Sequence, residues 1–329
     1  MKKNDNIEHK IIEYSEVFNE LKLNLKNIIV GQENLIDKIF IALLCNGHVL
    51  IEGVPGLAKT LTIKSLAKLL DTDYQRIQFT PDLLPADLIG TLIYNIKESK
   101  FEVKKGPIFS NIILADEINR SPAKVQSSLL EAMQERQVTI GNETYTMDSP
   151  FLVMATQNPI EQEGTYPLPE AQVDRFMFKI IVDYPNEDEE LQILKRFTSG
   201  KENLISEKII KIQDIMNSQK LINDIYIAEN IEKYIVKIIS SSRKPEDYGL
   251  KDLTSLISFG ASPRATIFLT YAAKARAFFE NRSYVTPQDI RYVIHDILRH
   301  RLILSYEAEA EEVKSQDIIN RIIETIPTP

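Results

Sequence analysis

The sequence has little that would suit a secreted protein, a membrane protein or a metal-cluster protein. It contains one cysteine, Cys45, which allows neither an internal disulfide nor a thiolate zinc cluster. The four histidines lack a ligand spacing, no apolar run reaches spanning length, and residues 1–5 do not resemble a signal peptide. Basic residues are in deficit: the net charge of −8 argues against a constitutive nucleic-acid coat, although a local basic groove stays open. We therefore expect a cytoplasmic protein without a membrane span.

The chain has enough length and apolar content for more than one packed core. Its 329 residues suggest two or three domains, and 43% of them are apolar. Five apolar runs have strand length, at 48–52, 74–79, 111–115, 151–156 and 177–182, and helical patterns separate most of them. This alternation predicts a parallel sheet that is covered by helices on both faces.

The most informative stretch is Gly53-Val54-Pro55-Gly56-Leu57-Ala58-Lys59-Thr60, between the first apolar run and a predicted helix over 61–70. A strand, a tight turn and a helix N-terminus form an anion site, because backbone N–H groups point inward and the helix dipole favours negative charge. Lys59 would add charge for the β- and γ-phosphates, and the Thr60 hydroxyl would bind Mg²⁺. The P-loop pattern has glycine where Ala58 stands, which is tolerable if that residue is already helical. The predicted nucleotide-binding residues here are Gly53, Pro55, Gly56, Leu57, Ala58, Lys59, Thr60 and Leu61.

Two carboxylates follow the third apolar run, in Leu114-Ala115-Asp116-Glu117. Ligands of open α/β sheets bind at the carboxyl edge of the strands, and this arrangement matches a Walker B motif. Asp116 would hold the Mg²⁺ shell, largely through water, and Glu117 would act as general base on the attacking water. An acidic start to a loop is the alternative reading, which the P-loop makes less attractive.

Three further polar residues are candidates for the same chemistry. Asn158 follows the fourth run and could orient water against the γ-phosphate, although an asparagine before proline is common in turns. Arg175 precedes the fifth run and suits a finger that stabilises phosphoryl charge in a neighbouring subunit, with a surface salt bridge as the alternative. Arg264 lies in the first turn of a helix predicted over 262–279, where a cation opposes the dipole unless an anion is near.

The remaining segments define insertions and a second domain. Prolines break the interval after the second strand, and residues 91–103 could form a hairpin. Ser121-Pro122 is expected to start a helix, and residues 138–145 read as a second hairpin turning on Gly141-Asn142. A first helix is expected to start at Ser15. After Pro185 strands stop, and helices are predicted over 189–197, 206–217, 228–241, 262–279 and 287–299, the last two with caps at Ser262-Pro263 and Thr286-Pro287.

Together these residues resemble the AAA+ ATPases, and within them the MoxR family. The general elements are the P-loop, the Asp116-Glu117 pair, Asn158 as sensor 1, Arg175 as arginine finger and Arg264, in Ser-Pro-Arg, as sensor 2. The MoxR resemblance rests on longer strings at 52–60, 78–85, 114–120 and 155–161, and it covers about residues 15 to 305. Many relatives share the alanine before the lysine.

The resemblance implies an α/β fold, with a five-stranded parallel sheet of order 5-1-4-3-2 covered by helices and a C-terminal all-helical lid domain. We accordingly assign 1–14 to a flexible N-terminus, 15–186 to the AAA+ nucleotide-binding domain and 187–329 to the lid. The implied helix-2 insertion lies at about 82–105 and the pre-sensor-1 hairpin at about 137–148. Val30, Gly31 and Gln32 would lie near the adenine.

The resemblance also implies a homo-oligomeric ring, commonly a hexamer, that holds ATP and Mg²⁺ between subunits. Relatives are thought to act as chaperones that remodel partners or insert metal into them, and these partners often carry a von Willebrand factor A domain. The implied function is therefore ATP hydrolysis coupled to remodelling, or to metal or cofactor insertion, in a protein client.

Two other functions share this plan. An MCM-like nucleic-acid motor would need basic residues on both insertions; Lys97, Lys100, Lys104 and Lys105 cluster in the first, but residues 138–147 of the second have no Lys or Arg. The ATPase subunit of magnesium chelatase is the other alternative, and the string Thr80-Pro81-Asp82 weakly favours MoxR over it. Nucleic acid is thus not expected as a partner.

Overall fold

The structure is a computed structural model that describes residues 2–54, 59–159, 164–198 and 210–329. The chain forms two compact units, which are described separately. The α/β unit comprises residues 17–176 and 180–216, and the helical unit comprises residues 1–16, 177–179 and 217–329. The domain boundaries expected at residues 14 and 186 stay a prediction, because compactness alone does not define a domain that folds by itself.

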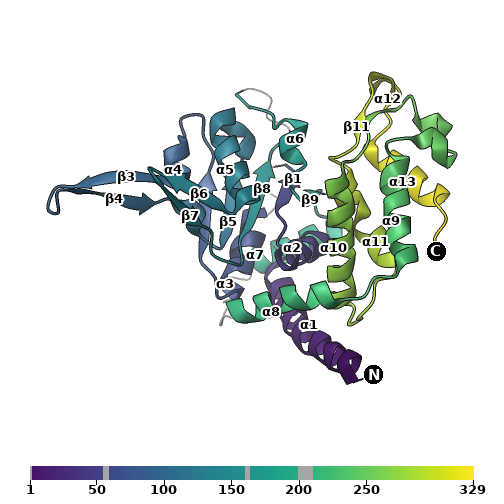
Figure 1. Cartoon of the computed structure of the whole chain (residues 1–329), viewed down its shortest axis with the longest axis horizontal. Helices are drawn as coiled ribbons and strands as arrows, with labels where there is room; N and C mark the ends of the chain where they lie inside the picture. The colour runs from purple at the N-terminus through teal and green to yellow at the C-terminus, as the bar shows by residue number, and fades with distance from the viewer. Residues whose placement is uncertain (1, 55–58, 160–163, 199–209) are drawn as a thin grey trace. The chain divides into compact units, whose positions relative to one another are not determined.

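A five-stranded sheet organises the α/β unit (Figure 1). Its order is β2 (Tyr74–Gln78), β5 (Ile112–Asp116), β8 (Leu152–Gln157), β1 (Val49–Glu52) and β9 (Phe178–Ile181). β2, β5, β8 and β1 pair in parallel. Numbered along the chain, this is the order 5-1-4-3-2 read from the other edge, so the predicted sheet is confirmed. All of β5 is buried, which explains its uninterrupted apolar sequence before the aspartate.

Most helices of the α/β unit follow the predicted apolar patterns, with two corrections at their starts. These helices are α2 (Glu33–Leu44), α3 (Lys59–Leu69), α5 (Ala123–Glu135) and α7 (Glu187–Thr198), and the short α6 (Glu170–Val173) was not predicted. The expected cap at Ser121 is wrong, because α5 begins at Ala123 with Pro122 in the cap position, and Ser121 ends the preceding 3₁₀ turn, Ile118–Arg120. The expected start at Ser15 is also wrong: α1 runs from Lys2 to Ile28, and the Ser15 hydroxyl donates to the Ile12 carbonyl inside that helix. A serine can bond to its own helix as well as cap one, so the sequence alone did not place these starts.

Both predicted insertions form hairpins. The first consists of α4 (Pro85–Ile89), β3 (Gly90–Asn95) and β4 (Lys100–Lys105), followed by a short 3₁₀ turn, Pro107–Phe109, and the β3–β4 hairpin extends away from the sheet (Figure 1). The second pairs β6 (Gln137–Ile140) with β7 (Glu143–Thr146) around Gly141, whose φ of 63° favours glycine. The two hairpins approach each other closely, because a Cβ on Gly141 would lie 2.7 Å from the Leu92 side chain.

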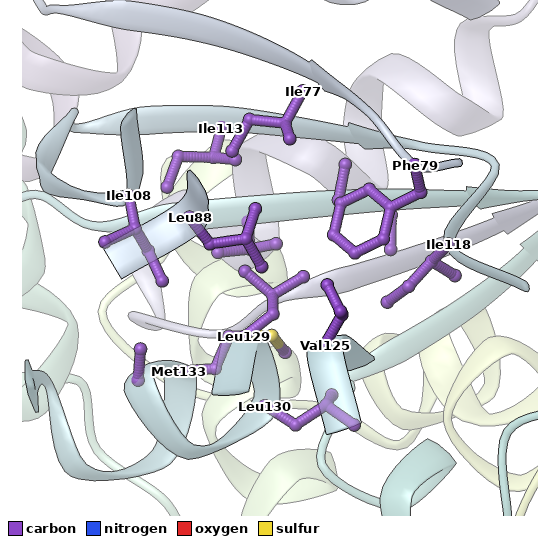
Figure 2. Close-up of a cluster of buried hydrophobic side chains, with 14 of the residues drawn as sticks. Ile77, Phe79, Leu88, Ile108, Ile113, Ile118, Val125, Leu129, Leu130 and Met133 are labelled. Atoms are coloured by element: carbon purple, nitrogen blue, oxygen red, sulfur yellow. The ribbon is translucent and has the colours of Figure 1, made fainter. Parts of the chain in front are cut away.

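A hydrophobic core cluster joins the sheet to the base of the first insertion (Figure 2). Ile77 and Phe79 from the β2 segment pack in it with Leu88 of α4 and Ile108 of the 3₁₀ turn. Side chains of α5, among them Leu129, close the cluster from the helix side. This packing orients β2: its odd-numbered residues 77 and 79 are buried, so the even-numbered ones lie on the other side of the strand.

The helical unit is built from predicted helices and from elements that the pattern did not reveal. It contains α9 (Glu229–Ser241), α10 (Pro263–Phe279), α11 (Pro287–Leu298), α12 (Tyr306–Ala310), α13 (Ser315–Thr325) and most of α8 (Ile212–Asp224). Compared with the helix expected over 206–217, α8 ends seven residues later, and residues 210–211, which were expected to be helical, precede it. Residues 206–209 lie outside the described part. The sequence also missed a short antiparallel pair, β10 (Ile257–Phe259) with β11 (Ile303–Leu304).

The caps expected at the last two predicted helices lie where the sequence placed them. Ser262 is the N-cap of α10, with Pro263 at its first position, and Thr286 is the N-cap of α11. The Thr286 backbone N–H donates to Asp289 at 2.7 Å.

Across the described part of the chain, none of the helices combines the length and apolar character that crossing a membrane requires.

Candidate active site

The predicted phosphate loop connects β1 to α3, but its centre lies outside the described residues. Pro55, Gly56, Leu57 and Ala58 are in that gap, so their expected roles stay predictions, as does the helical state expected for Ala58. On the near side, the Gly53 backbone N–H donates to the Gln157 carbonyl at 3.3 Å, which extends the β1–β8 pairing by one residue. On the far side, α3 begins at Lys59, and Thr60 and Leu61 follow in its first turn. The strand and the helix N-terminus that a phosphate site needs are therefore both present.

The turn Val30-Gly31-Gln32, predicted to lie near the adenine, is tied to the helix after the loop. Gly31 and Gln32 have φ values of 70° and 58°, and Gln32 directly precedes α2. The buried Thr62 of α3 donates from its hydroxyl to Gln32 Oε1 at 3.1 Å. This hydrogen bond brings two segments thirty residues apart to the same side of the candidate site. Contact with a base stays a prediction.

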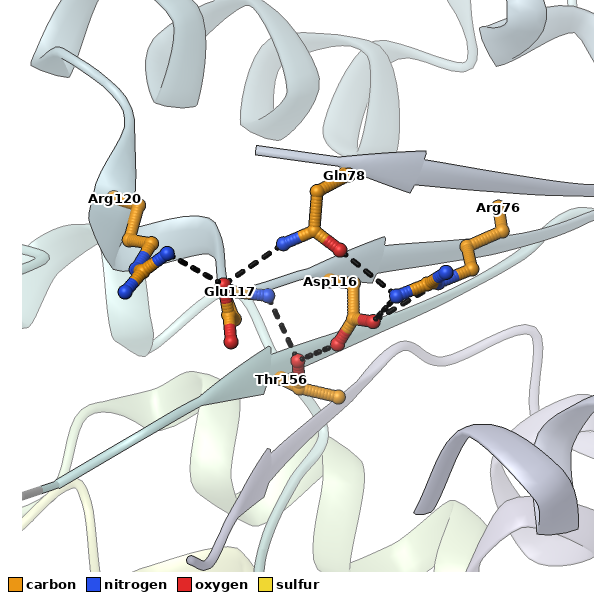
Figure 3. A network of polar contacts seen from close by, with 6 residues as sticks. All are labelled: Arg76, Gln78, Asp116, Glu117, Arg120 and Thr156. Atoms are coloured by element: carbon orange, nitrogen blue, oxygen red, sulfur yellow. Dashed lines mark hydrogen bonds and ion pairs between the residues drawn. The ribbon is translucent and has the colours of Figure 1, made fainter. Parts of the chain in front are cut away.

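The carboxylate pair lies at the carboxyl edge of β5, held from β8 by one hydroxyl (Figure 3). Thr156, which is 2% exposed, donates to Asp116 Oδ1 at 2.6 Å and accepts the Glu117 backbone N–H at 2.8 Å. Glu117 has the left-handed backbone, with φ 57° and ψ 50°, a conformation that non-glycine residues adopt at a cost and that is enriched at functional sites. The threonine thus fixes both the metal-side carboxylate and the start of the turn that carries the other.

Two β2 side chains complete this network, and neither was among the predicted site residues. Arg76 donates to Asp116 Oδ2 from Nε at 3.0 Å and from Nη2 at 2.7 Å, and Nη2 also donates to Gln78 Oε1 at 2.8 Å. Gln78 Nε2 in turn donates to Glu117 Oε2 at 2.8 Å. The only sequence signal is the alternation of polar Arg76 and Gln78 with apolar Ile77 and Phe79, which is common to half-buried strands in general.

The electrostatics around Glu117 and Asp116 are shaped by nearby cations and by burial. Arg120 Nη1 lies 3.4 Å from Glu117 Oε2, in the turn that follows the glutamate. Tyr74 shares its side of β2 with Arg76; burial raises the pKa of its phenol, Arg76 opposes this rise, and the Asp116 charge adds to it. The carboxylate pair is therefore neutralised within the fold by two arginines.

The three other candidates lie in different places. Asn158 is 6% exposed and directly follows β8, the strand between β5 and β1. A residue that orients water between the phosphate loop and the carboxylate pair is expected at this position. Arg175 lies just after α6, beside a pocket of about 220 Å³ whose wall includes Glu131 and Glu135 of α5. Within the described part of the chain, the Arg175 side chain has no hydrogen bond or ion pair. Arg264 is the second residue of α10, in the helical unit.

The donor set fits Mg²⁺ in a nucleotide complex better than a protein-only metal cage. The described residues contain no group of three or more His, Cys, Asp or Glu side chains that could hold a metal ion. Asp116 already accepts three hydrogen bonds, from Thr156 and twice from Arg76, which leaves roughly one of a carboxylate's four lone-pair positions available. One carboxylate contact, with a hydroxyl and phosphate oxygens completing the shell, is how Mg²⁺ is usually held at phosphate sites.

Comparison with known proteins agrees with the fold. The family model described as "ATPase family associated with various cellular activities (AAA)" matches residues 48–178, and the AAA lid domain matches residues 253–322. The first match covers four of the five strands, with the carboxylate pair, and ends where β9 begins; the second covers much of the helical unit. The fold and the site thus define an AAA+ ATPase module with its helical lid, as the sequence predicted.

Individual relatives show which family of AAA+ ATPases the chain resembles most. The chain is 49% identical to the chaperone MoxR1 of Mycobacterium tuberculosis, over 93% of this chain and 80% of that one, and 31% identical to the protein MoxR of Methylorubrum extorquens, over 92% of each. A crystal structure of a protein from Cytophaga hutchinsonii, provisionally described as an ATPase, superposes with a TM-score of 0.93 at 52% identity and covers all of both chains. The chain belongs to the MoxR family of AAA+ ATPases.

Proposed function

We propose that this chain binds ATP with Mg²⁺ and hydrolyses it to ADP and phosphate. The observation that carries the proposal is the hydrogen-bonded frame in which Thr156 holds Asp116 and Glu117 at the carboxyl edge of β5. This edge is where ligands of parallel α/β sheets bind, and α3 starts beside it after the predicted phosphate loop. When bound, Mg²⁺ would be held by Thr60 and Asp116 and would neutralise charge that develops on the phosphates.

Each residue has a defined part in this proposal. Lys59 binds the β- and γ-phosphates, and Glu117 accepts a proton from the attacking water. Asn158 orients that water. Arg264, as sensor 2, responds to the phosphates of its own or a neighbouring subunit, and Arg175 stabilises phosphoryl charge in a neighbouring subunit.

We further propose a homo-oligomeric ring, a hexamer, that remodels a protein client or assists metal or cofactor insertion into it. Two observations support this. The Arg175 side chain has no hydrogen-bonding or ionic partner within the described part of its own chain, as expected of a residue that serves another subunit. A relative at 49% identity is named a chaperone. A client with a von Willebrand factor A domain fits the family resemblance.

The assignment of roles is tested by two variants that should fail differently. Lys59→Ala removes phosphate-binding charge and is expected to weaken ATP binding. Glu117→Gln keeps the shape of the side chain and is expected to bind ATP, yet to turn over about 10²–10⁴-fold slower, the usual loss for a general base. Titration of a fluorescent ATP analogue against both proteins, beside a phosphate-release assay, measures this. Equal loss of binding in both variants would contradict the roles.

The shared site is tested by mixing inactive subunits. Arg175→Ala is expected to bind nucleotide but to lose most hydrolysis, since a finger supplied in trans contributes about 10³–10⁵ in rate. Lys59→Ala subunits have an inactive site but an intact Arg175, so co-expressed rings of the two variants should regain part of the activity, with a maximum at intermediate ratios. If verified mixed rings stay inactive at every ratio, either Arg175 is not the finger or the site is not shared.

A further inference from the structure

Arg76 is a cation at the magnesium end of the candidate site that belongs to none of the nucleotide motifs. Its guanidinium donates twice to Asp116 Oδ2, at 2.7 and 3.0 Å, across the β2–β5 pair (Figure 3). The Arg76 side chain is 49% exposed, whereas that of Asp116 is 12% exposed. A half-exposed arginine therefore neutralises a nearly buried carboxylate, with two charge-assisted hydrogen bonds that converge on one carboxylate oxygen while Thr156 occupies the other.

The fold leaves Arg76 little freedom to lie elsewhere. Ile77 and Phe79 anchor the opposite side of β2 in the core, and β2 pairs with β5 along its whole length, from Tyr74 with Ile112 to Gln78 with Asp116. Gln78 also holds the guanidinium through Nη2 at 2.8 Å. The strand register and a second side chain thus position this cation beside Asp116.

We propose that Arg76 is a positioning residue that acts as the counter-ion of Asp116 when Mg²⁺ is absent, and so sets how strongly nucleotide binding depends on Mg²⁺. The inference rests on the proposed ATP-binding function. ATP without its metal carries several negative charges, and an unneutralised Asp116 at the phosphate edge would repel them. Arg76 removes this repulsion in the metal-free state, and Mg²⁺ removes it in the loaded state.

The sign of the effect follows from this exchange of cations. In Arg76→Gln, binding of metal-free ATP should weaken, while binding of the Mg²⁺ complex should be kept or become tighter, because the metal no longer shares Asp116 with a guanidinium. The dissociation constant for metal-free ATP, divided by that for the Mg²⁺ complex, should rise about fivefold or more. This value is modest because solvent screens a half-exposed cation. Because the coupling between two ligands is reciprocal, the affinity for Mg²⁺ of the protein with ATP bound should rise by the same factor.

The experiment is a titration of a fluorescent ATP analogue in EDTA and again in saturating Mg²⁺, which needs no turnover. Arg76→Lys keeps the charge but loses the planar guanidinium with its two donors to Asp116, and it should stay close to the wild-type ratio. Arg136→Gln is the matched control: this arginine of the same unit donates to the Asn46 carbonyl, ahead of β1 and hence at the opposite edge of the sheet. In an Asp116→Asn background, Arg76→Gln should have no further effect on the ratio.

Two results would overturn the proposal. One is an unchanged ratio in Arg76→Gln, including a parallel loss of both affinities, which is what a purely structural role would give. The other is an equal rise in Arg136→Gln or in the Asp116→Asn background. If the wild-type protein binds the analogue under neither condition, the proposed function itself is wrong and this inference falls with it, so the two failures are distinguished by the wild-type titration.

Discussion

Replacing Thr156 by valine removes one hydroxyl while keeping the shape of the side chain, and it should destabilise the sheet edge that carries both carboxylates. Thr156 is 2% exposed, donates to Asp116 and accepts from the Glu117 N–H. A hydrogen bond to a charged group contributes about 1.5–3 kcal/mol, and an orphaned buried donor costs about 1–3 kcal/mol. Asp116 keeps its two bonds from Arg76, so the lower ends apply, and we expect a loss of about 2.5 kcal/mol in the free energy of unfolding.

Thr156→Ser is the matched control, because it keeps the hydroxyl and removes only a buried methyl group, which is worth about 0.8 kcal/mol. Urea unfolding followed by circular dichroism, at one protein concentration for all variants, gives both values. Phosphate release should also fall in Thr156→Val, since the turn at Glu117 loses its anchor. If the valine variant is as stable as the serine variant, the hydroxyl does not hold the pair and the reasoning is refuted.

Two further predictions concern His48 and Gly53. Burial, with a smaller effect of Arg136, lowers the pKa of His48 from its ordinary 6.5 to about 3. Between these two pH values the unfolded chain takes up a proton on this histidine and the folded chain does not. The free energy of unfolding should therefore decrease by about 1.4 kcal/mol per unit of pH as the pH falls below 6.5, and His48 should have no such effect above pH 6.5. Unfolding of His48→Gln between about pH 6.5 and 5 should show a shallower slope, and equal slopes would contradict this. In Gly53→Ala the new Cβ would lie 2.6 Å from the Val182 carbonyl oxygen, a backbone atom that cannot turn aside, so we expect a cost at the upper end of about 1–3 kcal/mol. In Gly164→Ala the new Cβ meets no atom of the described residues within 4 Å and should cost only about 1 kcal/mol for its positive φ. Thermal unfolding compares the two, and equal loss would exclude the clash.

Much of the fold follows from local patterns in the sequence. The strand around 112–116 was recognisable because a strand buried on both faces must be apolar throughout, and the carboxylates at its end stood out against that run. The β6–β7 hairpin was recognisable because Gly141 supplies a positive φ at the turn. These signals depend on a few adjacent residues, and the order of the sheet came with the family resemblance that they carry.

The ends of helices and the short strands were harder to predict from the sequence, because the same residue types serve several local roles. Ser121 and Pro122 look like a helix start, yet the serine ends a 3₁₀ turn and α5 begins at Ala123. β10 and β11 are short and pair across more than forty residues, so neither has an apolar run long enough to be noticed. Their pairing is a tertiary event that local propensity does not encode.

The sequence by itself determined the class of protein and the chemistry proposed for it, through the predicted phosphate loop and the Asp116-Glu117 pair, whose residue types and spacing are local. Only the tertiary structure decided which side chains surround that pair. Arg76 and Thr156 each lie forty residues from Asp116 along the chain. The parallel register of β2, β5 and β8 places them within hydrogen-bonding distance, and a register shift of one residue would turn them to the opposite face. Side chains that meet across strands are selected by pairing and packing, which no window along the sequence contains.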